Sequence, residues 1–232
     1  MTRRLILLRH GQTHYNASFR MQGQLDTELS EQGVRQAHAV GRVLAPRRPW
    51  TILSSDLRRA LDTATALATE VGLDVHTDPR LRETHLGTWQ GMSHSEVDDQ
   101  WPDARQQWRS SPRWSPPEGE SRLDVARRTR AVVDELVEQS PEWTEHPAVI
   151  VAHGGAIAAL TAALLELPVE QYPMFNGLGN TCWVQLSAHP RPQASRSRAV
   201  DLEVAPGTDT ARDLIWRLDQ WNAGITPPVA TP

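Results

Sequence analysis

The sequence predicts an α/β protein, a three-layer αβα sandwich with a mostly parallel central sheet. Three short apolar runs, over residues 5–8, 50–53 and 148–152, have the length of strands, and the first and last suit strands buried on both faces. A segment with apolar residues at helical spacing follows later along the chain from each of them. Strands that alternate with helices from start to finish are typical of a sheet covered by helices.

The remaining elements follow from the same patterns, taken in chain order. Strands are expected over 5–8, 50–53, 75–77, 148–152, 181–186 and 214–218. Helices are expected from Ser30 to Leu44, from Ser55 or Asp56 to Gly72, after Ser93, over 103–108, from Ser121 to Val137 and over 156–165. Serine and aspartate at these starts act as N-caps, and Gly72 ends its helix. Loops are expected over 12–28, 112–119 and 187–210.

Length and composition favour one domain. A chain of 232 residues with 39% hydrophobic residues can bury one substantial core, so we expect a single domain over 1–225 and a disordered tail over 226–232. The net charge of −4 disfavours nucleic acid or an anionic membrane surface as a partner. The single cysteine, Cys182, and the lack of a signal peptide or long apolar run indicate a cytoplasmic protein without disulfides.

Two of the nine histidines, His10 and His153, follow an apolar strand and precede a glycine. The two segments, LILLRHG and VIVAHGG, are similar to each other. This short similarity is not part of a longer sequence repeat. If the two strands are neighbours, the imidazoles face each other in the crevice beyond the strand ends, where α/β proteins bind ligands. We expect Gly11 to let a backbone N–H approach a ligand oxygen. His10 is the candidate nucleophile that takes a phosphoryl group.

Arginines near these histidines are candidates for binding phosphate. A phosphomonoester is a dianion, and arginine meets its oxygens in fork geometry better than lysine does. Arg9 adjoins His10, and Arg58 lies in the first turn after the second strand. The alternative for Arg58 is a solvated helix cation that pairs with Asp62, and we favour that alternative for Arg59.

A departing alkoxide needs a proton, and Glu83 is the candidate donor. It ends a third strand-like segment, so it is expected at the same edge of the sheet. A carboxyl group crowded by a phosphate dianion and partly desolvated keeps its proton near neutrality, as a general acid must. The alternative is a surface ion pair with Arg80 or Arg82, and the surrounding set of residues favours the acid.

These motifs together resemble the histidine phosphatase superfamily (branch 1). The matching segments are 9–13 with Asn16, 54–60 with Thr63 and Ala64, 81–83, and 151–154. They occur in the family's order and span residues 4–220. The resemblance implies a phosphoglycerate-mutase-like fold and a phosphomonoesterase that works through a phosphohistidine, with no cofactor and no metal. It also implies a small phosphorylated glycerate or sugar as substrate and a homodimeric assembly.

The resemblance also assigns roles to individual residues. His10 becomes the phosphohistidine, and Arg9, Arg58 and His153 surround the phosphoryl group. Glu83 donates the proton and later activates water. Residues expected to bind the substrate are Asn16, Gln22, Gly23, His85 and Gly154.

Four other functions remain open. One is a mutase of the same superfamily, although the stretch between Glu83 and His153 is shorter than in phosphoglycerate mutases, which favours an open, hydrolytic site. Another is a phosphatase of broad specificity. A third is a non-catalytic domain that binds phosphorylated ligands, which the retained His10 argues against. The last is a metallohydrolase with His10, His153 and Glu83 as ligands, which the neighbouring Arg9 disfavours because it repels a cation.

Overall fold

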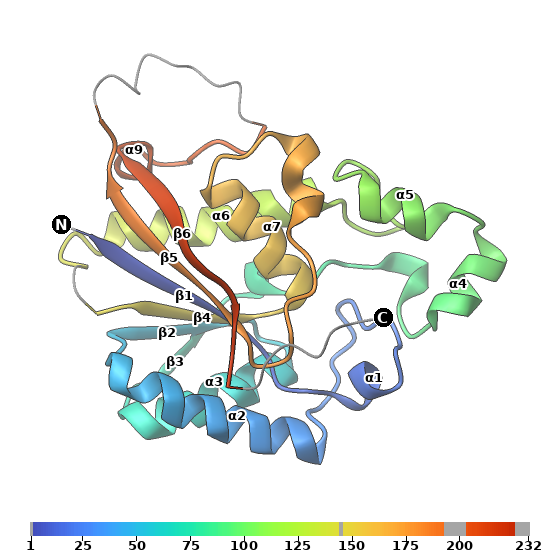
Figure 1. Cartoon of the computed structure of the whole chain (residues 1–232), viewed down its shortest axis with the longest axis horizontal. Coiled ribbons are helices and arrows are strands. Elements are labelled where there is room, and N and C mark those ends of the chain that lie inside the picture. The colour runs from blue at the N-terminus through green and yellow to red at the C-terminus, as the bar shows by residue number, and fades with distance from the viewer. Residues whose placement is uncertain (1, 144–145, 193–202, 226–232) are drawn as a thin grey trace.

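The computed structural model describes residues 2–143, 146–192 and 203–225 (Figure 1). The expected tail over 226–232 and part of the expected loop over 187–210 lie outside the described residues. The strands are β1 (Arg3–Arg9), β2 (Thr51–Ser54), β3 (Val75–Thr77), β4 (Ala148–Ala152), β5 (Trp183–Pro190) and β6 (Leu214–Ala223). The helices are α1 (His14–Ala17), α2 (Glu31–Leu44), α3 (Arg58–Val71), α4 (His94–Gln100), α5 (Ala104–Ser110), α6 (Arg122–Gln139), α7 (Gly154–Leu164) and α9 (Asp209–Arg212). Short 3-10 turns cover η1 (Ala45–Arg47), η2 (Pro79–Leu81), η3 (Gly87–Trp89) and η4 (Val169–Met174).

The six strands form one sheet in the order β3-β2-β4-β1-β5-β6. The first four strands of this order pair in parallel, and β5 and β6 add an antiparallel edge. Helices α2 and α3 cover one face of the sheet, and α6 and α7 cover the other (Figure 1). The predicted three-layer sandwich with a mostly parallel sheet is therefore confirmed.

Both faces of β1 are buried, which explains its unbroken apolar sequence. Successive side chains of a strand point to opposite faces. Leu5 and Leu7 pack toward α6 and α7, while Ile6 and Leu8 pack toward α2 and α3. Burying each such side chain contributes roughly 1.5–3 kcal/mol to stability. The two central strands, β1 and β4, are thereby fixed, and with them the positions at which they end.

A second, smaller cluster of tryptophans lies beyond the sheet. Trp89 is fully buried and packs against the rings of Trp101, Trp108 and Trp114, with centroids 5.4 to 6.3 Å away. These residues come from η3, from α5 and from the flanking loops, and α4 and α5 extend to one side of the sandwich (Figure 1). The cluster gives the segment its own apolar core, so it can stand as a wall beside the strand ends.

The structure corrects the sequence prediction at three places. Helix α3 starts without a side-chain cap from its own segment. Asp56 pairs with Arg82, and Asp26, from the loop before α2, accepts the Arg58 amide at 2.7 Å. Strand β5 continues to residue 190, inside the expected loop over 187–210, and α9 forms at 209–212, across the end of that loop. Pairing of β5 with β1 and β6 sustains the longer strand. Within 12–28, Thr13 caps the short helix α1.

Across the residues described here, no helix is long and apolar enough to span a membrane.

Candidate active site

His10 and His153 lie side by side where β1 and β4 end. The two strands pair with Arg9 opposite Ala152, so the next residue of each chain segment leaves the sheet at the same level. The ring centroids are 5.1 Å apart at an angle of 59°, and both side chains are buried. The expectation that the two imidazoles meet at the carboxyl edge of the sheet is confirmed.

The His10 ring is neutral and oriented. Its Nδ1 lies 2.7 Å from the Gly11 carbonyl oxygen, which can only accept, so Nδ1 carries the proton and Nε2 carries the lone pair. Burial, followed by the cations of Arg59 and Arg9, holds the pKa of His10 well below its ordinary value. A neutral ring with a free Nε2 is the form that can attack phosphorus.

His153 is held by Ser55, the residue that follows β2. Its Nε2 lies 2.9 Å from Ser55 Oγ, and its Nδ1 is buried without a hydrogen-bond partner in the part of the chain that the structure describes. Burial lowers its pKa well below the ordinary value, and Arg59, His10 and Arg9 add to the shift. His153 therefore stands as a neutral ring behind His10.

Arg59, and not Arg58, lies at the site. The Arg59 side chain is 1% exposed and donates from Nη1 to the Leu25 carbonyl at 2.7 Å and from Nη2 to the Gly23 carbonyl at 2.8 Å. Burial lowers its pKa to about 10, so it remains a cation at neutral pH. Arg58 is 57% exposed and pairs with Glu28. The placement of Arg58 beside the phosphoryl group was wrong, and so was the solvated position expected for Arg59.

The geometry of α3 explains this difference. Consecutive residues of a helix point about 100° apart, whereas residues four apart share a face. Arg59 shares its face with Thr63, whose hydroxyl accepts the Gly11 amide at 3.0 Å and donates to the Arg59 carbonyl. Arg58 points away from that face. Thr63 was the signal in the sequence that could have identified Arg59.

Gly11 has a packing role. Its amide is already bonded to Thr63. A Cβ at this position would lie 2.5 Å from the Gly33 carbonyl oxygen, so the missing side chain lets β1 approach α2. The structure thus gives the missing side chain a packing role, and the approach of a backbone N–H to a ligand oxygen stays a prediction.

Glu83 reaches the site at the N-terminus of α7. Its Oε1 accepts from the Ala156 amide at 2.9 Å, and Oε2 accepts from the Gly155 amide at 3.0 Å. The first amides of a helix have no partner within it, so a carboxyl group satisfies them. A Cβ on Gly155 would lie 2.6 Å from Oε1, so a side chain at this position would displace the Glu83 carboxyl group from where it stands.

The surface ion pair considered for Glu83 does not form. Arg82 pairs with Asp56, and Arg80 pairs with Asp78 and Glu135. Glu83 is therefore left to the helix amides and to the cavity.

These residues surround a cavity of about 220 Å³. It is lined by Arg9, His10, Asn16, Arg20, Met21, Gln22, Gly23, Arg59, Glu83, Thr84, Leu86, His94, Trp108 and Gly155. Three arginines face one carboxyl group, so the cavity is suited to an anion. The buried Nε atoms of Arg9 and Arg59 have no hydrogen-bond partner within the described ranges, and phosphate oxygens would satisfy such donors.

Asn16 and Gln22 line the cavity as expected, with their amide oxygens already engaged. Asn16 Oδ1 accepts from the Thr13 amide at 3.1 Å and from Asn180 Nδ2 at 3.2 Å. Gln22 Oε1 accepts from the hydroxyls of Thr13 and Thr27 at 2.9 and 2.6 Å. The amide nitrogens are thereby left as donors for a ligand.

Two expected substrate contacts lie elsewhere. His85 does not line the cavity; its Nδ1 lies 3.1 Å from the Glu118 carbonyl and 3.2 Å from the Gly87 amide, outside the strand ends. Gly154 instead packs against Arg9, since a Cβ there would lie 3.5 Å from Arg9 Nε. Both placements correct the sequence prediction, because residues next to a motif in sequence can point away from it.

Several residues at the cavity carry no recognisable signal in the sequence. Arg20, His94 and Trp108 come from segments without a recognisable motif, and the tertiary fold alone brings them to the cavity. Asn180 donates to the His10 carbonyl at 3.1 Å and holds Asn16, although it precedes β5 far along the chain. Within the described residues, no group of three or more His, Cys, Asp or Glu side chains could hold a metal ion.

The fold and this cavity define a class of α/β enzymes that handle phosphate esters with paired histidines and arginines. A family model of the histidine phosphatase superfamily (branch 1) matches residues 5–200, and the chain belongs to this family. The glucosyl-3-phosphoglycerate phosphatase of Mycolicibacterium vanbaalenii is 56% identical over 225 residues, covering 95% of each chain. That of Mycobacterium tuberculosis strain H37Rv is 54% identical over 226 residues, again covering 95% of each.

A solved structure shares the fold. The mycobacterial glucosyl-3-phosphoglycerate phosphatase in complex with inorganic phosphate superposes with a TM-score of 0.83 at 51% identity, covering 96% of this chain and 98% of that one.

Proposed function

We propose that this protein is a phosphomonoesterase that hydrolyses glucosyl-3-phosphoglycerate through a phosphohistidine at His10. The observation that carries the mechanism is the buried, neutral His10 ring, whose Nε2 carries the lone pair, in a cavity that Arg9 and Arg59 also line. Identities of 54–56% to glucosyl-3-phosphoglycerate phosphatases over 95% of the chain support the substrate.

In the first half-reaction, His10 Nε2 attacks phosphorus and the bond from phosphorus to the ester oxygen breaks. Arg9 and Arg59 offset the charge on the phosphoryl oxygens, with Asn16 as a further donor. The ester oxygen leaves with the bonding electron pair and takes a proton from the Glu83 carboxyl group. The leaving alcohol is neutral, and Glu83 is left as a carboxylate.

The second half-reaction consumes water. The Glu83 carboxylate takes a proton from a water molecule whose oxygen attacks the phosphohistidine. The bond from phosphorus to Nε2 breaks, and the neutral His10 ring is restored. Inorganic phosphate leaves, and Glu83 is protonated for the next cycle.

The leaving group is accommodated by the wall that α4 and α5 provide. Trp108 of α5 lines the cavity with an aromatic ring suited to a sugar. Arg20, which follows α1 and pairs with Glu96 of α4 at 3.4 Å, adds a cation suited to the glycerate carboxylate. These two residues take the role that the sequence analysis gave to His85, while Gln22 and Gly23 line the same cavity.

The experiment is a panel of phosphate-release assays. It contains glucosyl-3-phosphoglycerate, mannosyl-3-phosphoglycerate, 3-phosphoglycerate and simple sugar phosphates. The ratio kcat/KM is measured for each compound. We expect the glucosyl compound to lead. Equal kcat/KM values across the panel would indicate a broad phosphatase instead of the proposed function. Rapid exchange of 3- and 2-phosphoglycerate with little free phosphate would indicate a mutase.

We also infer a cytoplasmic homodimer formed by a single domain over 1–225. The superfamily resemblance supports the dimer, and a lone buried cysteine, Cys182, supports a reducing compartment. Light scattering gives the test of assembly: a species of the monomer mass, 25.9 kDa, would contradict it. Limited proteolysis tests the domain, since a cut between two stable halves would divide it.

A further inference from the structure

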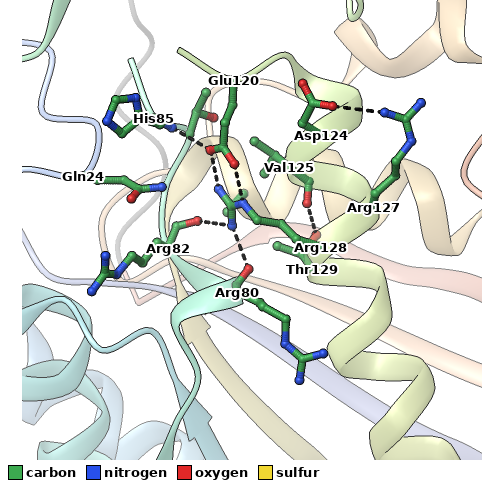
Figure 2. Close-up of polar contacts among 12 residues, drawn as sticks. Gln24, Arg80, Arg82, His85, Glu120, Asp124, Val125, Arg127, Arg128 and Thr129 are labelled. Atoms are coloured by element: carbon green, nitrogen blue, oxygen red, sulfur yellow. Dashed lines mark hydrogen bonds and ion pairs between the residues drawn. The ribbon is translucent and has the colours of Figure 1, made fainter. Parts of the chain in front are cut away.

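Arg128 of α6 points its guanidinium group at Arg80, Arg82 and Glu120 (Figure 2). Its Nη1 donates to the carbonyl oxygens of Arg80 and Arg82, both at 2.7 Å, and its Nη2 donates to the Glu83 carbonyl at 2.9 Å. Nε and Nη2 also bind the Glu120 carboxylate at 2.8 and 2.9 Å. A guanidinium has five N–H groups, so these five bonds use the whole fork.

Glu120 binds the backbone of the same segment at His85, on the C-terminal side of Glu83. Its Oε2 accepts the His85 amide at 2.8 Å, and its own amide donates to the His85 carbonyl at 2.8 Å (Figure 2). Burial opposes ionisation of Glu120, but hydrogen bonds from Arg128 and from the His85 amide hold its pKa below the ordinary value. Arg128 and Glu120 therefore form a charged pair that grips the backbone on both sides of Glu83.

Gln24 completes the support of Glu83. Its Nε2 donates to the Glu83 carbonyl at 3.0 Å, so that one oxygen accepts from both Gln24 and Arg128. The side-chain carboxyl group of Glu83 is held by the α7 amides. Both ends of Glu83 are thus fixed, the backbone by α6 and the carboxyl by α7.

We propose that Arg128 is a positioning residue for Glu83, which fixes the backbone from which the carboxyl group reaches the cavity. The inference rests on the proposed role of Glu83 as proton donor. Misplacing a reacting group by about 1 Å can cost on the order of 100-fold in rate. Lysine cannot replace Arg128, because an ammonium has three donors and no planar fork with which to hold three carbonyls and a carboxylate.

A leaving-group comparison separates positioning from a merely structural role. Proton donation matters for an alkyl phosphate, whereas p-nitrophenolate departs without a proton. The ratio kcat/KM reports the steps up to phosphoryl transfer to His10. We expect Arg128→Met and Arg128→Lys to lower kcat/KM about 10- to 100-fold for the best alkyl phosphate of the panel above, and less than about threefold for p-nitrophenyl phosphate.

Arg127→Met is the matched control. Arg127 is the neighbouring residue of the same helix and is 52% exposed, and its one ion pair among the described residues is with Asp124 at 3.0 Å (Figure 2). Its removal should leave kcat/KM for both substrates unchanged. Thermal melting of each variant checks the fold.

Glu83→Gln and its combination with Arg128→Met complete the test. If Arg128 acts through Glu83, the two losses on the alkyl phosphate do not add, because a carboxamide has no proton to deliver wherever it lies. Additive losses, or equal losses on both substrates from a normally melting Arg128 variant, would overturn the inference. If Arg128→Met does not fold, Arg128→Lys and Gln24→Leu carry the same measurement. If Glu83→Gln itself spares the alkyl phosphate, the proposed role of Glu83 fails and the inference with it.

Discussion

His10 and His153 meet ring to ring, with centroids 5.1 Å apart, because they follow paired residues of two adjacent parallel strands. Two imidazoles this close, fully buried and next to Arg9 and Arg59, cannot both take up protons at low electrostatic cost. The pair is therefore neutral in the folded protein and destabilises the fold in acid.

The free energy of unfolding should fall as the pH drops below the ordinary histidine pKa of about 6.5. Below that pH the unfolded chain binds protons that the folded chain refuses, since the pKa values of both rings are depressed. Each ring adds at most about 1.4 kcal/mol per pH unit to the slope of the free energy of unfolding against pH. It adds nothing at pH values well above the ordinary histidine pKa. Urea unfolding at several pH values measures it. His153→Asn should reduce the slope, and His76→Asn, at an exposed position, should not.

Arg59 and Arg58 should differ sharply when each is replaced by methionine. Arg59→Met removes a buried cation from the cavity wall and should lower kcat/KM for phosphate release by at least roughly 100-fold. Arg58→Met removes an exposed ion pair with Glu28 and should change it less than about threefold. Comparable losses in the two variants would place Arg58 at the phosphate after all.

This pair of arginines also shows where sequence reasoning stops. Apolar runs that end in His-Gly located both histidines, because a strand buried on both faces has a distinct composition and its end is marked by the first polar residue. Choosing between Arg58 and Arg59 required the first residue of α3, and a shift of one residue turns the helix face by about 100°. The cap that fixes this start, Asp26, lies in another segment.

Asn180 lay beyond sequence reasoning for a similar reason. It reaches His10 and Asn16 only because β5 pairs antiparallel with β1, and nothing in its own neighbourhood indicates this pairing. The cavity wall from Arg20, His94 and Trp108 depends likewise on the packing of the tryptophan cluster. Local patterns predict elements well, whereas a site assembled across elements follows from their packing.

Gly155→Ala should lower the activity of the protein without unfolding it. The new methyl group would lie 2.6 Å from Glu83 Oε1 and 3.2 Å from Thr84 Oγ1, so the carboxyl group must move off the α7 amides. Position 155 is exposed, and alanine is the better helix former, so the melting temperature should stay close to that of the wild type. We expect a 10- to 100-fold loss of kcat/KM for an alkyl phosphate. An active variant would mean that Glu83 is not needed where it stands.

Chelation should leave the activity unchanged. The buried cations Arg9 and Arg59 flank His10 and repel a metal ion, and they already supply the positive charge that a phosphoryl group needs. Phosphate release after dialysis against EDTA, with and without added zinc, makes the measurement. A loss of activity that zinc restores would contradict the prediction and would indicate a metallohydrolase with His10, His153 and Glu83 as metal ligands.

A phosphoryl group should be trapped on His10 and on no other residue. Its Nδ1 donates to the Gly11 carbonyl, which leaves the lone pair on Nε2, whereas His153 Nε2 is engaged with Ser55 Oγ. Rapid quenching after mixing with a labelled substrate should yield protein-bound phosphate that acid removes and base does not, as expected of a phosphorus–nitrogen bond. Glu83→Gln should raise the trapped fraction with p-nitrophenyl phosphate, because the base that activates water is lost while the leaving group needs no proton. His10→Asn should abolish the label, and peptide mapping that places it on His153 would reverse the roles of the two rings.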